Sequence, residues 1–298
     1  MSKFTLPIII VAISGLILGC AQTTRAQLNP SQTMYFQNRY MYNPAMAGID
    51  EGLNLNLGYK QQWSNFPGMP RTSTFTSDYQ MQKVGIGLNV ADYKEGLIRS
   101  TRVMGTYAYH LPVGADEKLS FGLSLGVNDS RVDNGELTGD AGDAEVAQYN
   151  QLKPYVDGDF GIAYTSDNLY VGAALPNMKS IFFKSSDTRF DADRLLFMAS
   201  ISYKMDLSNE ARATLLEPLV AYRIVNGYNN IIDGGVNLTL ANYGLSMQAL
   251  YHSSKAVGLG VGFDQRAYGL NLSYNMASGN LNDYSLGGFE LGLRIKVF

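Results

Sequence analysis

The sequence has few of the residues that metal and thiol chemistry require. Among its 298 residues there is one cysteine, Cys20, and there are two histidines, His110 and His252. Zinc sites are built largely from cysteine and histidine, and a Cys–His nucleophile needs both. His252 and Ser253 are neighbours, and neighbouring side chains of a strand point to opposite faces, which disfavours a base and nucleophile pair. We therefore predict no enzyme activity, no cofactor and no metal.

Charge is also scarce and nearly balanced. Charged residues make up 16% of the chain, and the formal net charge is −3. So small an imbalance gives no electrostatic reason to expect nucleic acid as a partner. Long apolar runs are missing as well, because after Leu18 none approaches the roughly 20 residues that a membrane-spanning helix requires. If the mature chain lies in a membrane, it crosses that membrane as a β-barrel.

Residues 1–26 are interpreted as a signal peptide, since Lys3 precedes an apolar run over residues 6–18 and small residues follow. Two cleavage sites compete. Cleavage after Ala26 is favoured, and it leaves a mature chain without cysteine and hence without disulfides. In the alternative, residues 17–20 form a lipobox and Cys20 is lipidated. We exclude this segment from the fold.

Alternation of apolar and polar residues with a period of two runs through the remaining chain. This pattern is typical of strands whose two faces meet different surroundings. About fourteen such segments follow from the pattern and the turn signals. The clearest cover residues 53–60, 84–90, 119–127, 257–264 and 268–276. Residues 71–80 are the weakest, and we count them because their neighbours need an antiparallel partner.

Charged residues inside these segments fall on the face opposite the apolar residues. A lipid-facing Arg or Lys at mid-membrane costs roughly 2 to 4 kcal/mol, so a membrane barrel enforces this sorting. The residues sorted in this way are Arg102, His110, Asp157, Asp159, Arg194, Lys204, Glu217, Arg223 and Asp233. A soluble sandwich also alternates, but globular strands usually run five or six residues, and several here run about ten.

The connections give a second indication of a membrane barrel. Long ones, over residues 62–70, 92–98, 128–153, 176–191 and 277–284, alternate with short ones, as outward loops and periplasmic turns do. We predict an all-β fold, a transmembrane antiparallel up-and-down β-barrel of about 14 strands over residues 52–298, in contact with outer-membrane lipid. An even strand count places both termini in the periplasm.

The last segment, residues 289–297, is predicted to close the barrel by pairing with residues 52–61. Leu291, Leu293, Ile295 and Val297 form its lipid-facing side, and Glu290, Arg294 and Lys296 form the other. The terminal Phe298 is out of phase with this lipid-facing side. We interpret it as a barrel-assembly signal.

Residues 27–51 form a short aromatic segment that is expected at the periplasmic side. Asn43, Pro44 and Gly48 supply turn signals before the first strand. Four aromatic residues precede or flank them, namely Tyr35, Phe36, Tyr40 and Tyr42. Exposed aromatic side chains must be covered by something. Either they fold into the barrel as a plug, or they form a periplasmic docking patch for a partner.

Two sequence stretches carry a family resemblance. Residues 37–48, which include Asn43, Pro44 and Gly48, and residues 59–72, which include Trp63 and Phe66, resemble the PorP/SprF family of Bacteroidota outer-membrane proteins. Lys60 stands where that family usually has Arg. The resemblance implies a component of type IX secretion and gliding that assists secretion, or surface attachment, of a large exported protein with a C-terminal sorting domain, such as a gliding adhesin. It also implies periplasmic ring components of the secretion machine as possible partners.

Function is therefore predicted to be binding. The aromatic segment together with Trp63 and Phe66 is the candidate docking site on the periplasmic side. The outward loop over residues 128–153 is the candidate surface contact, with Asp129, Asp133, Glu136, Asp140 and Asp143. Such acidic residues also serve simply to solvate a loop. The alternative function is a general or ligand-selective outer-membrane pore, which the lumen of a 14-stranded barrel permits.

Overall fold

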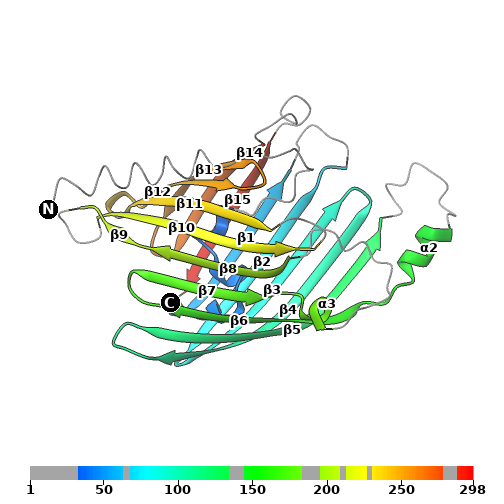
Figure 1. The fold of residues 1–298 in the computed structure, drawn as a ribbon, viewed down its shortest axis with the longest axis horizontal. Helices are drawn as coiled ribbons and strands as arrows, with labels where there is room; N and C mark the ends of the chain where they lie inside the picture. The colour runs from blue at the N-terminus through cyan, green and yellow to red at the C-terminus, as the bar shows by residue number, and fades with distance from the viewer. Residues whose placement is uncertain are drawn as a thin grey trace.

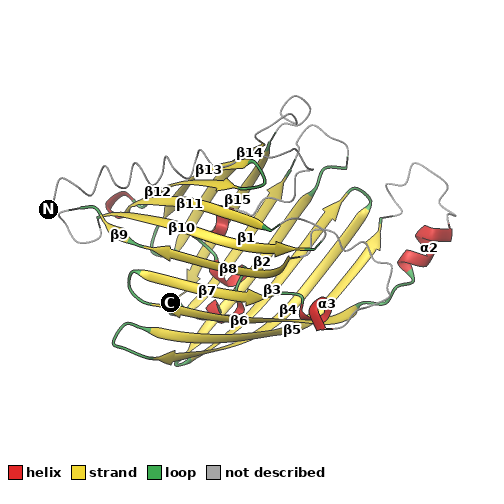
Figure 2. Ribbon diagram, viewed as in Figure 1, coloured by secondary structure: helices red, strands yellow, loops and turns green. Residues whose placement is uncertain are grey.

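The alternating segments form strands that pair antiparallel with both neighbours and close into a barrel, shown in Figures 1 and 2. The structure is a computed structural model. It describes residues 33–62, 68–133, 144–182, 195–208, 213–226, 230–277 and 287–297. Trp63, Phe66, Cys20, Phe298 and the cleavage sites therefore lie outside the described residues.

The strand bounds agree with the period-two pattern. The strands are β1 (Leu53–Gln61), β2 (Arg71–Met81), β3 (Val84–Glu95), β4 (Ile98–Pro112), β5 (Lys118–Val132), β6 (Tyr155–Thr165), β7 (Leu169–Leu175), β8 (Leu195–Tyr203), β9 (Met205–Asp206), β10 (Thr214–Val225), β11 (Ile231–Leu240), β12 (Leu245–His252), β13 (Ala256–Asp264), β14 (Tyr268–Ala277) and β15 (Gly288–Val297). β8 and β9 pair with the same strand, β10, and only Lys204 separates them, so the barrel has 14 strand positions. The predicted fold and strand number are confirmed.

The first and last strands close the barrel. Leu53 lies opposite Val297, and the register continues without a break to Gln61 opposite Phe289. The segment with the weakest pattern, residues 71–80, lies within β2 and pairs with both β1 and β3. Closure at β1 and β15 was predicted from the alternation of residues 289–297, and that prediction is confirmed.

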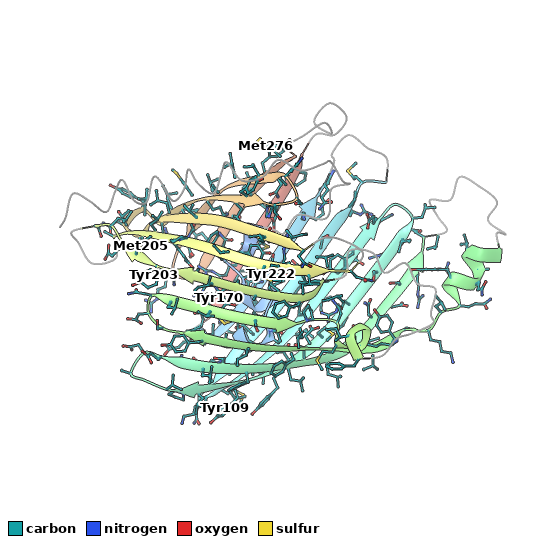
Figure 3. All side chains as sticks on the ribbon, in the orientation of Figure 1. Tyr109, Tyr170, Tyr203, Met205, Tyr222 and Met276 are labelled. Atoms are coloured by element: carbon teal, nitrogen blue, oxygen red, sulfur yellow. The ribbon has the colours of Figure 1, made fainter. Side chains whose placement is uncertain are left out.

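The wall is apolar outside and polar inside. Outward side chains such as Leu125 (66% exposed), Tyr107 and Val261 are left uncovered by protein. Inward positions carry Asn56, Thr76 and other buried polar residues. In Figure 3, Tyr109 projects from the outer surface, away from the barrel. This inverted arrangement is the one that lipid outside and polar groups inside impose.

The connections gather at two ends of the barrel. We call one the short-connection end, where the β2–β3, β6–β7 and β13–β14 turns lie. The long-connection end carries the β5–β6 and β7–β8 connections, with α2 (Ala144–Asn150) and α3 (Met178–Phe182) on the right in Figure 1. β1 begins and β15 ends at the short-connection end.

Two predicted connections differ from the structure. The predicted outward loop over residues 92–98 is a tight turn, because β3 runs to Glu95 and β4 starts at Ile98. Gly96 has a φ of 57°, a left-handed conformation that glycine adopts without strain and that lets this turn close. The predicted loop over residues 128–153 also begins later, since β5 continues to Val132. Polar residues at the long-connection end of these strands concealed the period-two pattern there.

Short 3₁₀ helices lie ahead of β1 and between β11 and β12. They are η1 (Thr33–Tyr35), η2 (Arg39–Met41), η3 (Pro44–Met46) and η5 (Ala241–Tyr243). Within the described parts of the chain, no helix has the length and apolarity needed to span a membrane.

We expect Leu123→Arg to lower the free energy of unfolding by about 2 to 4 kcal/mol, because Leu123 is in the middle of the outward apolar stretch of β5. Its side chain is 53% exposed on the outer surface. Leu111→Arg, near the end of β4, is the matched control and should cost about 0 to 1 kcal/mol, since a rim cation reaches water. Urea unfolding in lipid vesicles measures both. Equal losses would contradict a lipid-facing wall.

Candidate functional site

The segment ahead of β1 lies inside the barrel. We call residues 33–49 the plug. It consists of η1, η2 and η3, and asparagines fix two of its turns. The side chain of Asn38 accepts a hydrogen bond from the Met41 N–H, and that of Asn43 accepts one from the Ala45 N–H. Pro44 sits at the first position of η3, where its missing N–H is not needed.

Most plug side chains are withdrawn from solvent. Tyr35 is 3% exposed, Tyr40 5%, and Ala45 and Ala47 are fully buried. Rings stack inside the segment, with 4.8 Å between the ring centroids of Tyr35 and Tyr42. Among the described residues, these side chains make their contacts inside the lumen. This is the arrangement expected if the aromatic segment folds into the barrel as a plug.

The plug lies on a row of small residues that crosses five adjacent strands. We call this row the small-residue trough, and its members are Gly85, Ala108, Gly122, Gly161 and Ala174, each directly opposite the next. A Cβ added to Gly122 would lie 2.2 Å from the Ala45 nitrogen, and one added to Gly85 would lie 1.8 Å from the Ala47 carbonyl oxygen. The plug backbone therefore occupies space that any larger side chain would fill.

The end of the plug is tied to the wall near the short-connection end. His110 Nε2 lies 2.9 Å from the Ala47 carbonyl oxygen, and because a carbonyl only accepts, Nε2 carries the hydrogen. The other ring nitrogen faces Ser120 Oγ at 2.8 Å. The Gly48 N–H donates to Asp78 Oδ2 at 3.0 Å. Gly48 has a φ of 65°, which suits glycine where the chain turns towards β1.

Two further hydrogen bonds hold the middle of the plug. The Tyr40 hydroxyl donates to Thr106 Oγ1 at 2.8 Å, and Asn38 Nδ2 donates to Thr76 Oγ1 at 2.9 Å. Burial raises the pKa of Tyr40 above its ordinary value, so the phenol stays protonated and remains a donor. These contacts reach β2 and β4.

On the opposite wall, Tyr35 joins a buried charged cluster. Its hydroxyl donates to Asp233 Oδ2 at 3.1 Å. The same carboxylate accepts from Arg223 through two bonds, Nε at 2.6 Å and Nη2 at 3.0 Å, and lies 2.6 Å from His252 Nδ1. Asp233 and His252 have no exposed surface. The plug thus completes the hydrogen bonding of a carboxylate on β11.

Arg39 supplies the ion pair between plug and wall. Its guanidinium pairs with Glu217 on β10 and donates to Ser202 Oγ at 2.9 Å. It also lies over the ring of Tyr170, 4.2 Å from the centroid, so the cation is held by charge and by the aromatic face. Since Ser202 Oγ donates to Glu217 at 2.7 Å, the three side chains form one network.

A cavity of about 260 Å³ remains beside the plug. It lies against β1, β10 and β15 at the short-connection end, and its lining mixes both signs of charge. The charged lining residues are Arg39, Lys204, Arg294, Lys296, Asp50, Asp78 and Glu217. The lining favours polar or zwitterionic contacts over an apolar ligand.

A second covering lies over the lumen at the long-connection end. The backbone N–H of Asn177 donates to Asp159 Oδ1 and that of Lys179 to Asp157 Oδ1, both at 2.9 Å. Both carboxylates face the lumen from β6 and are nearly buried. Asp159 also pairs with Arg102 at 2.6 Å. Asn177 and the first turn of α3 therefore fold back over the barrel mouth.

The predicted docking residues are placed as follows. Tyr35, Tyr40, Asn43, Pro44 and Gly48 are buried in the lumen, and Phe36 and Tyr42 are partly buried there. Their predicted role in docking stays a prediction, but they do not form an exposed patch in this structure. The burial follows from the trough, which offers the aromatic segment a surface to pack on.

The predicted surface-loop acids are divided. Asp129 lies in β5, where it pairs with Arg131 at 2.8 Å, because the strand continues past the expected loop start. Asp133 follows β5 and lies 3.3 Å from Lys94 Nζ. Glu136, Asp140 and Asp143 lie outside the described residues. No group of three or more potential metal ligands occurs among the residues that the structure describes.

The sequence alone does not reveal the partners of Arg39 or the hydrogen bond from Tyr35 to Asp233. Alternation placed Glu217 and Asp233 on the lumen face, but which plug residue meets them depends on the folded path of residues 33–49. Lumen-facing glycines at positions 85, 122 and 161 were a usable signal, because glycine on a strand face often marks close approach of another backbone.

We expect Gly122→Ala to lower the free energy of unfolding by about 1 to 3 kcal/mol, since the added methyl group overlaps the plug backbone. The shifted plug should also expose the Arg39–Tyr40 peptide bond to trypsin. Gly105→Ala on the outer face of β4 is the control, because the nearest atom to its added Cβ is 3.9 Å away. Equilibrium unfolding and timed trypsin digestion test this. Trypsin protection unchanged from the parent would contradict the trough as the seat of the plug.

Among solved structures, the chain is similar in fold to outer-membrane channels. The CymD monoaromatic hydrocarbon channel aligns with a TM-score of 0.54 and 10% identity, covering 87% of this chain and 92% of that chain. The Ralstonia pickettii toluene transporter TbuX aligns with a TM-score of 0.51 and 12% identity, covering 87% and 93%. At these identities the likeness shows the fold alone, an outer-membrane β-barrel. Comparison with the curated proteins gives no match.

The family comparison is more specific. A family model described as "Type IX secretion system membrane protein PorP/SprF" matches residues 24–295. Neither this family nor the channels that share the fold are enzyme families, in agreement with the expectation of no catalysis. The match includes the plug, the trough strands and most of β15, so the chain belongs to the PorP/SprF family of type IX secretion system membrane proteins.

Proposed function

We propose that the protein is a plugged outer-membrane barrel that assists secretion, or surface attachment, of a large exported protein such as a gliding adhesin. The observation that carries this proposal is the plug, whose contacts reach β2, β4, β8, β10 and β11 across the lumen. A lumen occupied in this way is suited to a fixed anchor. The exported partner is expected to carry a C-terminal sorting domain, as the family resemblance implies.

In this proposal the short-connection end faces the periplasm, and both termini are periplasmic. Two features support this orientation. Membrane barrels have short periplasmic turns and longer outward loops. The β5–β6 and β7–β8 connections, the longest of the barrel, lie together at the other end. The mixed-charge cavity would then open towards periplasmic ring components of the secretion machine, which are the proposed partners on that side.

The exported protein is proposed to contact the long-connection end. There α2 is tied to the end of β5, because Asn150 Oδ1 accepts from the Val132 N–H at 2.7 Å while its Nδ2 donates to the Val132 carbonyl at 3.1 Å. This pair of hydrogen bonds to the Val132 backbone fixes the base of the loop. Asp133 and the acidic residues Glu136, Asp140 and Asp143 remain the proposed surface contacts.

A second candidate function is a ligand-selective or general pore. The cavity of about 260 Å³ favours it, since space lined by charged residues remains beside the plug. A pore would use this space as part of a water-filled path, whereas an anchor has no need of one. The two functions therefore differ in ion conductance.

We expect the protein to be silent in planar bilayers, and the combined variant Tyr35→Ala, Arg39→Ala and Tyr40→Ala to show conductance, because these changes remove three anchors of the plug. Tyr107→Ala on the outer face, where the ring is 55% exposed, is the control for loss of a tyrosine. Single-channel recording makes the comparison. A large, steady conductance of the unmodified protein would support the pore in place of the anchor.

Affinity purification from cell envelopes is expected to recover one large surface protein with the barrel. Deleting residues 134–146 should reduce display of that partner at the surface while the barrel still folds. Deleting residues 279–284, in the β14–β15 connection at the same end, is the control for loop shortening. Partner display unchanged by the first deletion would refute the proposed role of the β5–β6 connection.

A further inference from the structure

The outer face of β4 and β5 has a sharply bounded apolar band. On β4 the outward apolar positions run from Val103 to Leu111, and on β5 they run from Leu119 to Val127. Each stretch is nine residues long, close to the 9 to 11 residues that a tilted membrane strand needs. Both strands continue past this band at the long-connection end. Their last outward residues therefore lie beyond the hydrocarbon layer.

Basic residues form a row across four strands in this extension. We call it the cationic row. Its members, Arg71 on β2, Lys94 on β3, Arg99 on β4 and Arg131 on β5, are each directly opposite the next. All four share the outward parity of the apolar band. Like charges directly opposite one another destabilise a sheet, so this arrangement needs anions nearby.

One row nearer the apolar band, two aspartates supply part of the negative charge that the cationic row needs. Arg99 Nε lies 2.9 Å from Asp92 Oδ1, and Arg131 Nε lies 2.8 Å from Asp129 Oδ2. Each pair draws its guanidinium back along the wall towards the membrane. The Arg99 and Arg131 side chains nevertheless stay 61% and 66% exposed.

Lys94 is arranged differently from the arginines. Its ammonium lies 3.3 Å from Asp133 Oδ2, and its side chain is only 9% exposed. The contact groups of the row are therefore Arg99 and Arg131, with the exposed Arg71 beside them.

The height of the row above the band matches a lipid head group. Arg99 lies four residue steps from Val103, which is about 13 Å along the strand and about 10 Å along the membrane normal at the usual strand tilt. The polar layer of one leaflet is about 5 to 8 Å thick. A guanidinium that bends back towards Asp92 therefore reaches this layer.

We propose that the cationic row binds the phosphate groups of membrane lipid head groups, through Arg99 and Arg131 acting as a pair. Guanidinium groups match phosphate oxygens with two parallel hydrogen bonds, and a phosphate between the two arginines would relieve their mutual repulsion. The row is continuous with the lipid-facing surface, which favours a lipid as its occupant over a soluble anion or a protein.

The remainder of the described wall supports a local site. At the same end, the outward residues of the other described strands carry no charge: Gln61 on β1 is polar, and Val156 on β6, Ile232 on β11 and Tyr251 on β12 are apolar or aromatic. The row is thus confined to β2–β5. A lipid bound there would fix the height of this side of the barrel in the membrane.

Native mass spectrometry of the full-length protein tests the proposal, with bisphosphorylated lipid A and its dephosphorylated form as probes and phosphatidylglycerol as a second phosphate source. The unmodified protein should retain at least five times more phosphorylated than dephosphorylated lipid A. The double variant Arg99→Gln and Arg131→Gln should lose this preference. Lys83→Gln with Arg266→Gln, two exposed cations at the short-connection end, makes the same change in net charge and should keep it.

The outcomes distinguish the kinds of ligand that the row could bind. Preference for lipid A over phosphatidylglycerol, lost in the Arg99 and Arg131 variant, assigns the site to a phosphorylated glycolipid. An equal preference for both, lost in the same variant, assigns it to any lipid phosphate. Preference retained by that variant, or lost equally in the control, overturns the proposal. Loss of co-purified exported protein with lipid preference intact would make the row a protein contact and also overturn it. Heat-modified gel migration confirms that each variant is a folded barrel.

Discussion

Closure of the wall at β1 and β15 is the constraint on which the structure depends. Hydrocarbon offers no partner to a backbone N–H or C=O, so each unsatisfied group costs several kcal/mol. The continuous register from Leu53 opposite Val297 to Gln61 opposite Phe289 removes the two edges that an open sheet would leave in lipid. The alternation of the final strand follows, because β15 must keep one face in lipid while it pairs on both sides.

Closing 14 strands creates a second problem on the inner side. A lumen of this size is wider than that of an eight-stranded barrel, which its own side chains just fill. The plug occupies the space, and the wall accommodates it with glycine and alanine where backbones meet, as at Gly122 and Ala108. Elsewhere the wall offers polar side chains. A buried carboxylate such as Asp233 is tolerated because Arg223, His252 and Tyr35 all contact it.

The sequence alone predicts the strands of the barrel wall better than it predicts the contacts of the plug inside the lumen. Strand positions and faces follow from period-two alternation, and even β2, with its weak pattern, is required by its neighbours. The turn at Gly96 was missed, since the polar residues Asp92 and Lys94 suggested a loop although they are outward strand residues beyond the hydrocarbon layer. Alternation alone does not predict the trough or the Arg39–Glu217 pair, because both depend on the register of several strands and on the path of residues 33–49. Local sequence does not encode that path.

The plug is better suited to hold than to open. It is covalently continuous with β1, and its contacts reach walls on opposite sides of the lumen, at Thr106 and at Asp233. Withdrawing it would remove the Tyr35 hydroxyl from Asp233 and the Arg39 guanidinium from Glu217 at the same time. Breaking one buried ion pair alone costs about 3 to 5 kcal/mol. Withdrawing the plug by small steps does not lower this energetic cost, because no partly withdrawn position restores the lost contacts. Plug and wall therefore act as one rigid unit, which leaves the barrel ends and the outer rim as the surfaces available to the proposed partners and to lipid.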